Sequence, residues 1–140
     1  MKELPGDVFV TGQLLAAQMQ ALAEQGVMSF INNRPDMEGP MQPHSEELEK
    51  TAQELGVDYH HIPMAGGLTP GLIEASQTAF ENLPRPIVAF CASGMRSAAL
   101  WAFAHVDKLG VDGVMEAVSA AGYNLEQIRG PLESMAKSKP

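Results

Sequence analysis

Short apolar runs alternate with longer segments that carry apolar residues at helical spacing along most of the chain. The apolar runs predict strands at residues 7–12, 27–32, 57–62 and 86–90. The segments between them predict helices near residues 13–26, 45–55 and 69–82. Strands that alternate with helices in this way indicate an α/β fold with a central, mostly parallel sheet of four to five strands flanked by helices.

Two strands differ in the environment that their pattern predicts. The run PIVAF at 86–90 is nearly all apolar, and a strand without a polar face is expected at the centre of a parallel sheet. The run at 7–12 closes with Gly12 and is expected to form an edge strand. Residues 33–44 contain three prolines and one glycine, so we expect a loop there.

The C-terminal third predicts helices only. One helix is expected to run from about Arg96 to Gly110, a second from Asp112 to Gly122, and a short third one from NLEQ at 124–127. We expect residues 1–140 to form a single domain in which residues 1–6 and 130–140 are frayed.

Composition narrows the class of protein. The 140 residues are 45% hydrophobic and 19% charged, which is typical of a globular domain. The net charge of −8 argues against nucleic acid and anionic membranes as partners. The chain has no apolar stretch long enough to span a bilayer, and its N-terminus lacks signal-peptide features, so the cytoplasm is the expected compartment. One cysteine and four scattered histidines predict no disulfide, metal or cofactor.

The candidate chemistry is concentrated in CASGMRS, residues 91–97, where the central strand ends and a helix begins. The backbone amides predicted to converge there on an anion belong to Ala92, Ser93, Gly94, Met95 and Arg96. The Arg96 guanidinium can clamp an oxyanion, and the same positive field lowers the pKa of the Cys91 thiol. Ser97 can donate a hydrogen bond to the sulfur or the anion. A buried, inert thiol is the alternative, but this order of residues favours a reactive cysteine.

Further polar residues are candidates for the rim of this site. Asn33 and Arg34 follow a strand and should reach the same sheet edge, where Arg34 adds positive charge and Asp36 can hold an arginine. A turn stabilised by Asn and Asp side chains explains the same residues equally well. Of His60 and His61, which alternate along a strand, at most one faces the site as a proton donor. Gln13 and Gln42 are weaker candidates.

Five motifs occur in a recognisable order: VTGQL, INNRPDMEG, HIPMAGGLT, CASGMRSAALWA and AAGYNL. Together, over about residues 7–128, they resemble the bacterial family named after the phosphatase-like domain of β-lactamase-hydrolase-like proteins, which is also described as a sulfur transferase family. The resemblance implies a dual-specificity-phosphatase-like fold, Cys91 as nucleophile and Arg96 as oxyanion ligand. This chain carries Phe90, Ala92 and Met95 where family members often carry polar residues.

Two features bear on whether the site handles sulfur or phosphate. The loop has four residues between Cys91 and Arg96, as in rhodanese-type sulfurtransferases, whereas tyrosine and dual-specificity phosphatases have five. No carboxylate lies between His60 and Gly71, where such phosphatases place their general acid. Both features favour a sulfurtransferase that passes sulfur from thiosulfate or a persulfide, through a Cys91 persulfide, to an external thiol or cyanide.

Two other functions stay open at this point. The first is phosphomonoester hydrolysis through a cysteinyl-phosphate, with a phosphate-type anion as substrate. The second is a catalytically weak module that binds anions or phosphoproteins, which the apolar residues Phe90, Ala92 and Met95 suggest.

Overall fold

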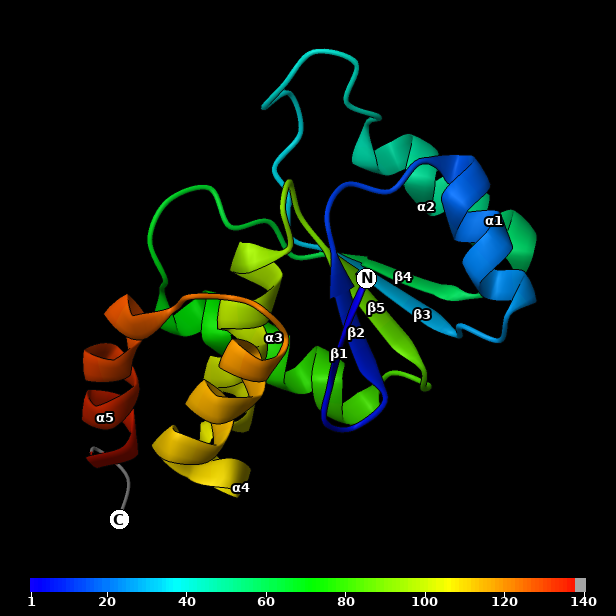
Figure 1. Cartoon of the computed structure of the whole chain (residues 1–140). Helices are drawn as coiled ribbons and strands as arrows, with labels where there is room; N and C mark the ends of the chain where they lie inside the picture. The colour runs from blue at the N-terminus through cyan, green and yellow to red at the C-terminus, as the bar shows by residue number, and fades with distance from the viewer. Residues whose placement is uncertain (138–140) are drawn as a thin grey trace.

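The computed structural model describes residues 1–137, in which five strands form one sheet in the order β1-β2-β5-β3-β4 (Figure 1). The strands are β1 (Lys2–Leu4), β2 (Val8–Thr11), β3 (Ser29–Asn32), β4 (Asp58–His61) and β5 (Ile87–Phe90). Strands β2 to β5 pair in parallel, and only β1 is antiparallel to its neighbour. The predicted mostly parallel sheet is therefore confirmed, with β5 at its centre.

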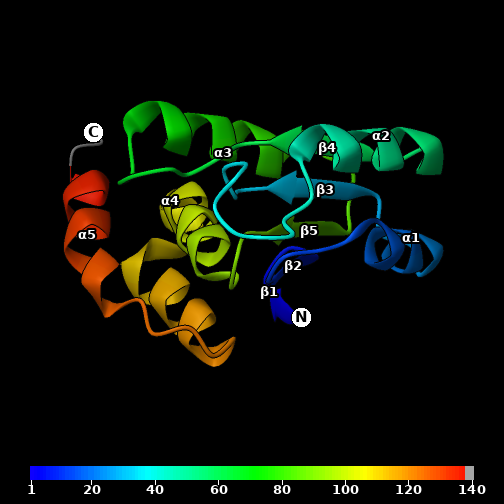
Figure 2. The same ribbon diagram turned by 90° about the horizontal axis from the view of Figure 1, so that it is seen from above.

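Helices cover both faces of this sheet. They are α1 (Ala16–Glu24), α2 (Ser45–Leu55), α3 (Pro70–Asn82), α4 (Met95–Ala120), the 3-10 turn η1 (Glu126–Ile128) and α5 (Arg129–Lys137). Figure 2 shows α1 and α2 on one face and α3 and α4 on the other, with α5 beyond α4. A helix runs between successive parallel strands because each crossover must return the chain to the same end of the sheet.

The alternation of side chains along β5 divides the core into two parts. Ile87 and Ala89 pack into the larger cluster, which includes α4, whereas Val88 and Phe90 pack into the smaller cluster with α1 and α2. All four side chains are buried. This two-sided burial explains why the strand has no polar position, and it fixes the direction in which β5 delivers Cys91 to the sheet edge.

The N-terminus departs from the sequence-based prediction. Leu4 is buried in the core, and β1 covers the outer edge of β2, so residues 7–12 do not form the edge strand. The chain reverses at Gly6, whose φ of 94° suits glycine. The prediction that residues 1–6 are frayed is wrong for β1, because a three-residue strand with one buried side chain leaves no recognisable pattern.

The C-terminal helices agree in part with the prediction. The backbone leaves helical geometry at Gly110, which has a φ of 75°, at the break predicted between two helices. The prediction of a frayed end from residue 130 is wrong as far as Lys137, since α5 forms and buries Leu132 completely. Residues 138–140 lie outside the described residues. Within residues 1–137, no helix has the length and apolarity needed to span a membrane.

Candidate active site

Cys91 lies directly after β5, at the edge of the sheet where the parallel strands end. The loop 33–44 after β3 and the loop 62–69 after β4 leave the sheet at the same edge (Figure 1). In α/β folds this edge collects ligand-binding groups, because the loops that follow the strands converge there. The fold thus brings together three loops that are far apart in the sequence.

The loop between β5 and α4 curls around the Cys91 sulfur. The Gly94 amide donates a hydrogen bond to Cys91 Sγ at 3.1 Å, and the Gly94 carbonyl accepts from Ala98 in the first turn of α4. Gly94 has a φ of 93°, a left-handed conformation that strains residues with a side chain. Cys91 and Gly94 are buried, while Ala92, Ser93 and Met95 are exposed. The Gly94 amide thus contacts a buried sulfur, whereas the Met95 amide donates to Ser93 Oγ at 3.4 Å.

The surroundings of Cys91 favour its thiolate form. Burial on its own raises the pKa of the thiol, but hydrogen bonds from the backbone amides of Ser97, Ser93 and Gly94 outweigh it. The net pKa of Cys91 is therefore lowered. The N-terminus of α4 adds positive potential in the same direction. A low-pKa thiolate is the form that attacks electrophiles.

Ser97 and Asn33 form a buried pair beneath the loop. The Ser97 hydroxyl donates to Asn33 Oδ1 at 2.8 Å, and Asn33 Nδ2 donates to the Ile62 carbonyl at 2.9 Å. A hydroxyl has one hydrogen, so Ser97 cannot donate to Asn33 and to the sulfur at once. In this arrangement the backbone amides stabilise the thiolate. Asn33, predicted at the rim, instead lies below it and ties the ends of β3, β4 and α4 together.

Arg96 folds back from the first turn of α4 onto the loop 33–44. Its Nη1 and Nη2 donate to the two Glu38 carboxylate oxygens at 2.9 and 2.8 Å, and Nη1 also donates to the Met64 carbonyl at 3.0 Å. The hydrogen bond to Glu38 raises the pKa of Arg96, and the charge of Cys91 adds to this effect. Arg96 is thus a permanent cation that is held beside the sulfur.

Glu38 joins a second arginine to this network. Arg34 donates from Nε to Glu38 Oε1 at 3.1 Å and from Nη1 to Gln13 Oε1 at 3.1 Å. Hydrogen bonds from Arg96, and after it from Arg34, lower the pKa of Glu38 in spite of partial burial. Arg34, predicted at the rim, is thus linked to Arg96 through the Glu38 carboxylate. Sequence reasoning gave no role to Glu38, because an acid in a proline-rich loop carries no periodic signal.

Asp36 does not hold an arginine. Its Oδ1 accepts a hydrogen bond from the Ser45 amide at 2.8 Å, at the first residue of α2. Asp36 therefore caps a helix, where a carboxylate satisfies a free amide and complements the helix dipole. Gln42 likewise shapes the loop, because it accepts from the amides of Glu38 and Gly39. The predicted alternative, a turn stabilised by Asn and Asp side chains, is instead seen at Asn32, whose Oδ1 accepts a hydrogen bond from the Arg34 amide at 2.9 Å.

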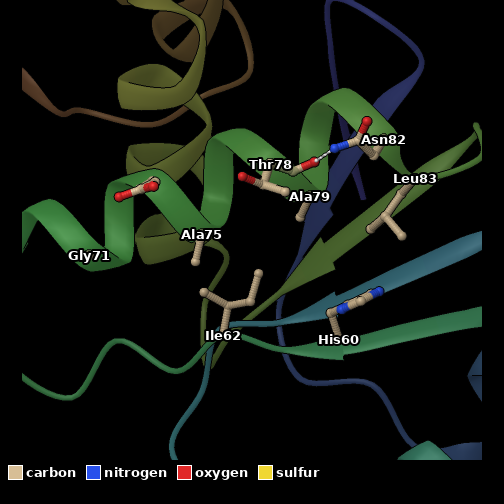
Figure 3. A pocket seen from close by; sticks show the side chains of 9 residues that line it. His60, Ile62, Gly71, Ala75, Thr78, Ala79, Asn82 and Leu83 are labelled. Atoms are coloured by element: carbon tan, nitrogen blue, oxygen red, sulfur yellow. Dashed lines mark hydrogen bonds between the residues drawn. The ribbon is translucent and has the colours of Figure 1, made fainter.

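The contacts of His60 and His61 do not support the predicted role of either histidine as a proton donor at the candidate site. His60 lines a cavity of about 500 Å³ between β4 and α3 (Figure 3), whose lining includes no residue of the Cys91 loop. His61 Nε2 lies 2.8 Å from the Arg34 carbonyl and so contacts the backbone of the loop 33–44. The loop after β4 touches Arg96 through Met64, yet it carries no carboxylate, as the sequence predicts. Residues 1–137 contain no cluster of side chains suited to a metal ion.

Solved structures share this fold. A candidate phosphatase of Neisseria meningitidis matches with a TM-score of 0.82 and 29% identity, over 95% of this chain and 96% of that one. Tk-PTP in its active form gives a TM-score of 0.71 at 17% identity, covering 99% and 97% of the two chains. The catalytic domain of the PP-IP phosphatase SIW14 from S. cerevisiae, in complex with citrate, gives 0.62 at 18%, covering 97% and 90%. The predicted dual-specificity-phosphatase-like fold is confirmed.

Sequence relatives point to the same family. The β-lactamase hydrolase-like protein of Agrobacterium fabrum is 36% identical over 93 residues, which is 66% of this chain and 22% of that protein. The protein of the same name from Xylella fastidiosa strain Temecula1 is 32% identical over 117 residues, which is 81% of this chain and 26% of that protein. The chain therefore spans about a quarter of the length of these relatives.

These findings bear on whether the site transfers sulfur or hydrolyses phosphate esters. The predicted sulfurtransferase activity finds no support among the relatives, whereas the solved structures are those of phosphatases or candidate phosphatases. The model of the phosphatase-like domain of β-lactamase hydrolase-like proteins matches residues 1–108, which include every residue of the Cys91 loop. The chain belongs to this family of phosphatase-like domains.

Proposed function

We propose that the chain is a cysteine-dependent phosphatase that hydrolyses phosphate monoesters or similar phosphoryl compounds through a cysteinyl-phosphate. The observation that carries this proposal is the Gly94 amide on Cys91 Sγ at 3.1 Å, at the start of α4, with Arg96 beside it. An amide-lined loop at a helix N-terminus suits a tetrahedral oxyanion. The phosphatase fold of the structural neighbours and the citrate in the yeast structure support an anionic, phosphate-type substrate.

The reaction takes place in two displacements. In the first, the Cys91 thiolate attacks phosphorus, the S–P bond forms, the ester P–O bond breaks, and the leaving oxygen takes a proton from water. In the second, water attacks phosphorus, the S–P bond breaks, and inorganic phosphate leaves with the thiolate restored. The loop amides and Arg96 stabilise the oxygens of the phosphoryl group in both steps.

The lack of a carboxylate in the loop after β4 limits which leaving groups the proposed enzyme can release. It reaches Arg96 through the Met64 carbonyl and has no carboxylate to protonate a departing alkoxide. General acid catalysis contributes about 10²–10⁴-fold, so substrates that need it are poor ones here. Aryl phosphates and phosphoanhydrides, whose leaving groups are stable as anions, are the expected substrates.

A paired assay tests the proposal. Aryl phosphate hydrolysis and sulfur transfer from thiosulfate to cyanide are measured with the wild-type chain and with Cys91→Ser. We expect phosphate release in the wild type and a loss of more than about 10³-fold in the variant, since a missing nucleophile removes the covalent route. Sulfur transfer without phosphate release would reverse the assignment. Absence of both activities, with anion binding retained, would favour the binding module.

A further inference from the structure

Tyr123 follows α4 in the chain and lies beside Gly94 of the Cys91 loop. It follows Gly122, whose φ of 95° turns the backbone, and its amide donates to the Val118 carbonyl at 3.0 Å. The Tyr123 hydroxyl lies directly against Gly94, so closely that a methyl group on Gly94 would collide with it. The aromatic ring packs on the core cluster that includes α4. The phenol of Tyr123 is therefore fixed by its ring and ends at the anion loop.

The two tyrosines of the chain differ in what their hydroxyls contact. The Tyr59 hydroxyl accepts from Asn32 Nδ2 at 2.9 Å and lies 2.7 Å from Ser45 Oγ. Among residues 1–137, no such hydrogen-bond partner faces the half-buried Tyr123 hydroxyl. A phenolic hydroxyl usually finds a partner when it is removed from bulk water. The Tyr123 hydroxyl thus keeps its donor free beside the loop.

Tyr123 also lies within electrostatic reach of the nucleophile. Gly94 connects the two groups, because its amide contacts Cys91 Sγ while its α-carbon contacts the Tyr123 hydroxyl. Burial, and after it the charge of the Cys91 thiolate, raise the pKa of Tyr123. The phenol consequently stays protonated at neutral pH, and it can only donate to an anion, not repel it.

We infer that Tyr123 is an anion-binding residue of this site, whose hydroxyl donates a hydrogen bond to an oxygen of the tetrahedral anion held over Cys91. The inference rests on the proposed function for the anion site itself. The loop offers few side-chain donors of its own, since Ala92, Gly94 and Met95 have none. Tyr123 adds a donor from outside the loop, and it does so without adding charge.

Protection of Cys91 from alkylation measures this contact without requiring turnover. Iodoacetamide alkylation is followed while inorganic phosphate, or in parallel sulfate, is titrated into the wild type, Tyr123→Phe and the control Tyr59→Phe. We expect Tyr123→Phe to need about 10-fold more of either anion for half protection, because the variant loses one hydrogen bond to a charged group, and a tenfold change corresponds to about 1.4 kcal/mol. Its alkylation rate without anion and its melting temperature should stay close to wild type, because the ring is kept.

The control separates this contact from a general loss of stability. Tyr59→Phe removes a hydroxyl with two partners, so it should lower the melting temperature and leave the half-protecting concentration unchanged. Equal anion concentrations for the wild type and Tyr123→Phe would overturn the role of Tyr123 while leaving the anion site in place. Failure of both anions to protect even the wild type would contradict the anion site, and with it both proposals.

Discussion

The loops 91–97 and 33–44 form opposite sides of the candidate site, and they are built by different means. In 91–97 the backbone provides the chemistry: the Gly94 amide donates to Cys91 Sγ, and Gly94 supplies the turn. In 33–44 the side chains provide it: Glu38 holds Arg34 and Arg96 through its carboxylate. Backbone chemistry follows from local sequence, whereas side-chain networks depend on which loops the fold brings together.

The largest effect is expected where the two loops meet, at Arg96. Arg96→Lys keeps the charge but loses the planar fork that binds two oxygens, so kcat/KM for an aryl phosphate should fall about 10²–10³-fold, as for a lost oxyanion donor. The matched control is Arg129→Lys, because Arg129 also donates to two carboxylate oxygens, one from Asp112 and one from Glu126, but on the surface of the protein. Similar activities for both variants would contradict a role for the Arg96 fork.

A change of the backbone in the loop 91–97 should have the next largest effect. In Gly94→Ala the new methyl group meets the Tyr123 hydroxyl and the residue keeps a positive φ, so the loop must shift. Moving the Gly94 amide away from Cys91 removes a hydrogen bond that lowers the thiol pKa. The midpoint of the alkylation rate against pH should therefore move to higher pH, and kcat/KM should fall about 10²-fold.

Gly56→Ala is the control for that change. Gly56 also has a positive φ, of 73°, but a methyl group there meets nothing within 4 Å. It should cost about 1–2 kcal/mol of stability through backbone strain and leave the alkylation midpoint unchanged. If the alkylation midpoint were unchanged in Gly94→Ala as well, the Gly94 amide would not be a group that lowers the pKa of the Cys91 thiol.

A change of the side-chain network in 33–44 should have the smallest effect. Glu38→Gln keeps the shape of the side chain and removes its charge, so Arg96 is held less firmly and kcat/KM should fall about 10-fold. Because an aligned arginine binds substrate better, we expect the change mainly in KM. Glu126→Gln, which weakens the contact to Arg129, is the control and should leave KM unchanged. A rise in activity in Glu38→Gln would instead show that this carboxylate competes with the substrate for Arg96.

The sequence predicts the sheet and the Cys91 loop well because both depend on local patterns. Four strands, the central place of residues 86–90 and the curl at Gly94 follow from apolar runs and from one glycine before a helix. The strand β1 was not predicted because Leu4 is its single buried residue, and one apolar position forms no pattern. Local patterns of this kind therefore predict the loop 91–97, in which the backbone provides the chemistry.

The contacts between loops could not be predicted in the same way. Asp36 and Glu38 are two residues apart in one proline-rich segment, yet one caps α2 and the other binds two arginines. Only the position of α4 over the sheet decides which acid meets Arg96. Tyr123 and Gly94 are likewise far apart in the sequence, and they meet because the chain turns back at Gly110, between the two parts of α4.

In the proposed reaction, Cys91 carries a phosphoryl group between the two displacements. Intact-mass analysis after an acid quench, with an aryl phosphate as substrate, tests it directly. We expect an adduct with the mass of one phosphoryl group on the wild-type chain, mapped to Cys91 and absent from Cys91→Ser. An adduct of one sulfur atom after thiosulfate treatment, with no phosphoryl adduct under any condition of turnover, would contradict it.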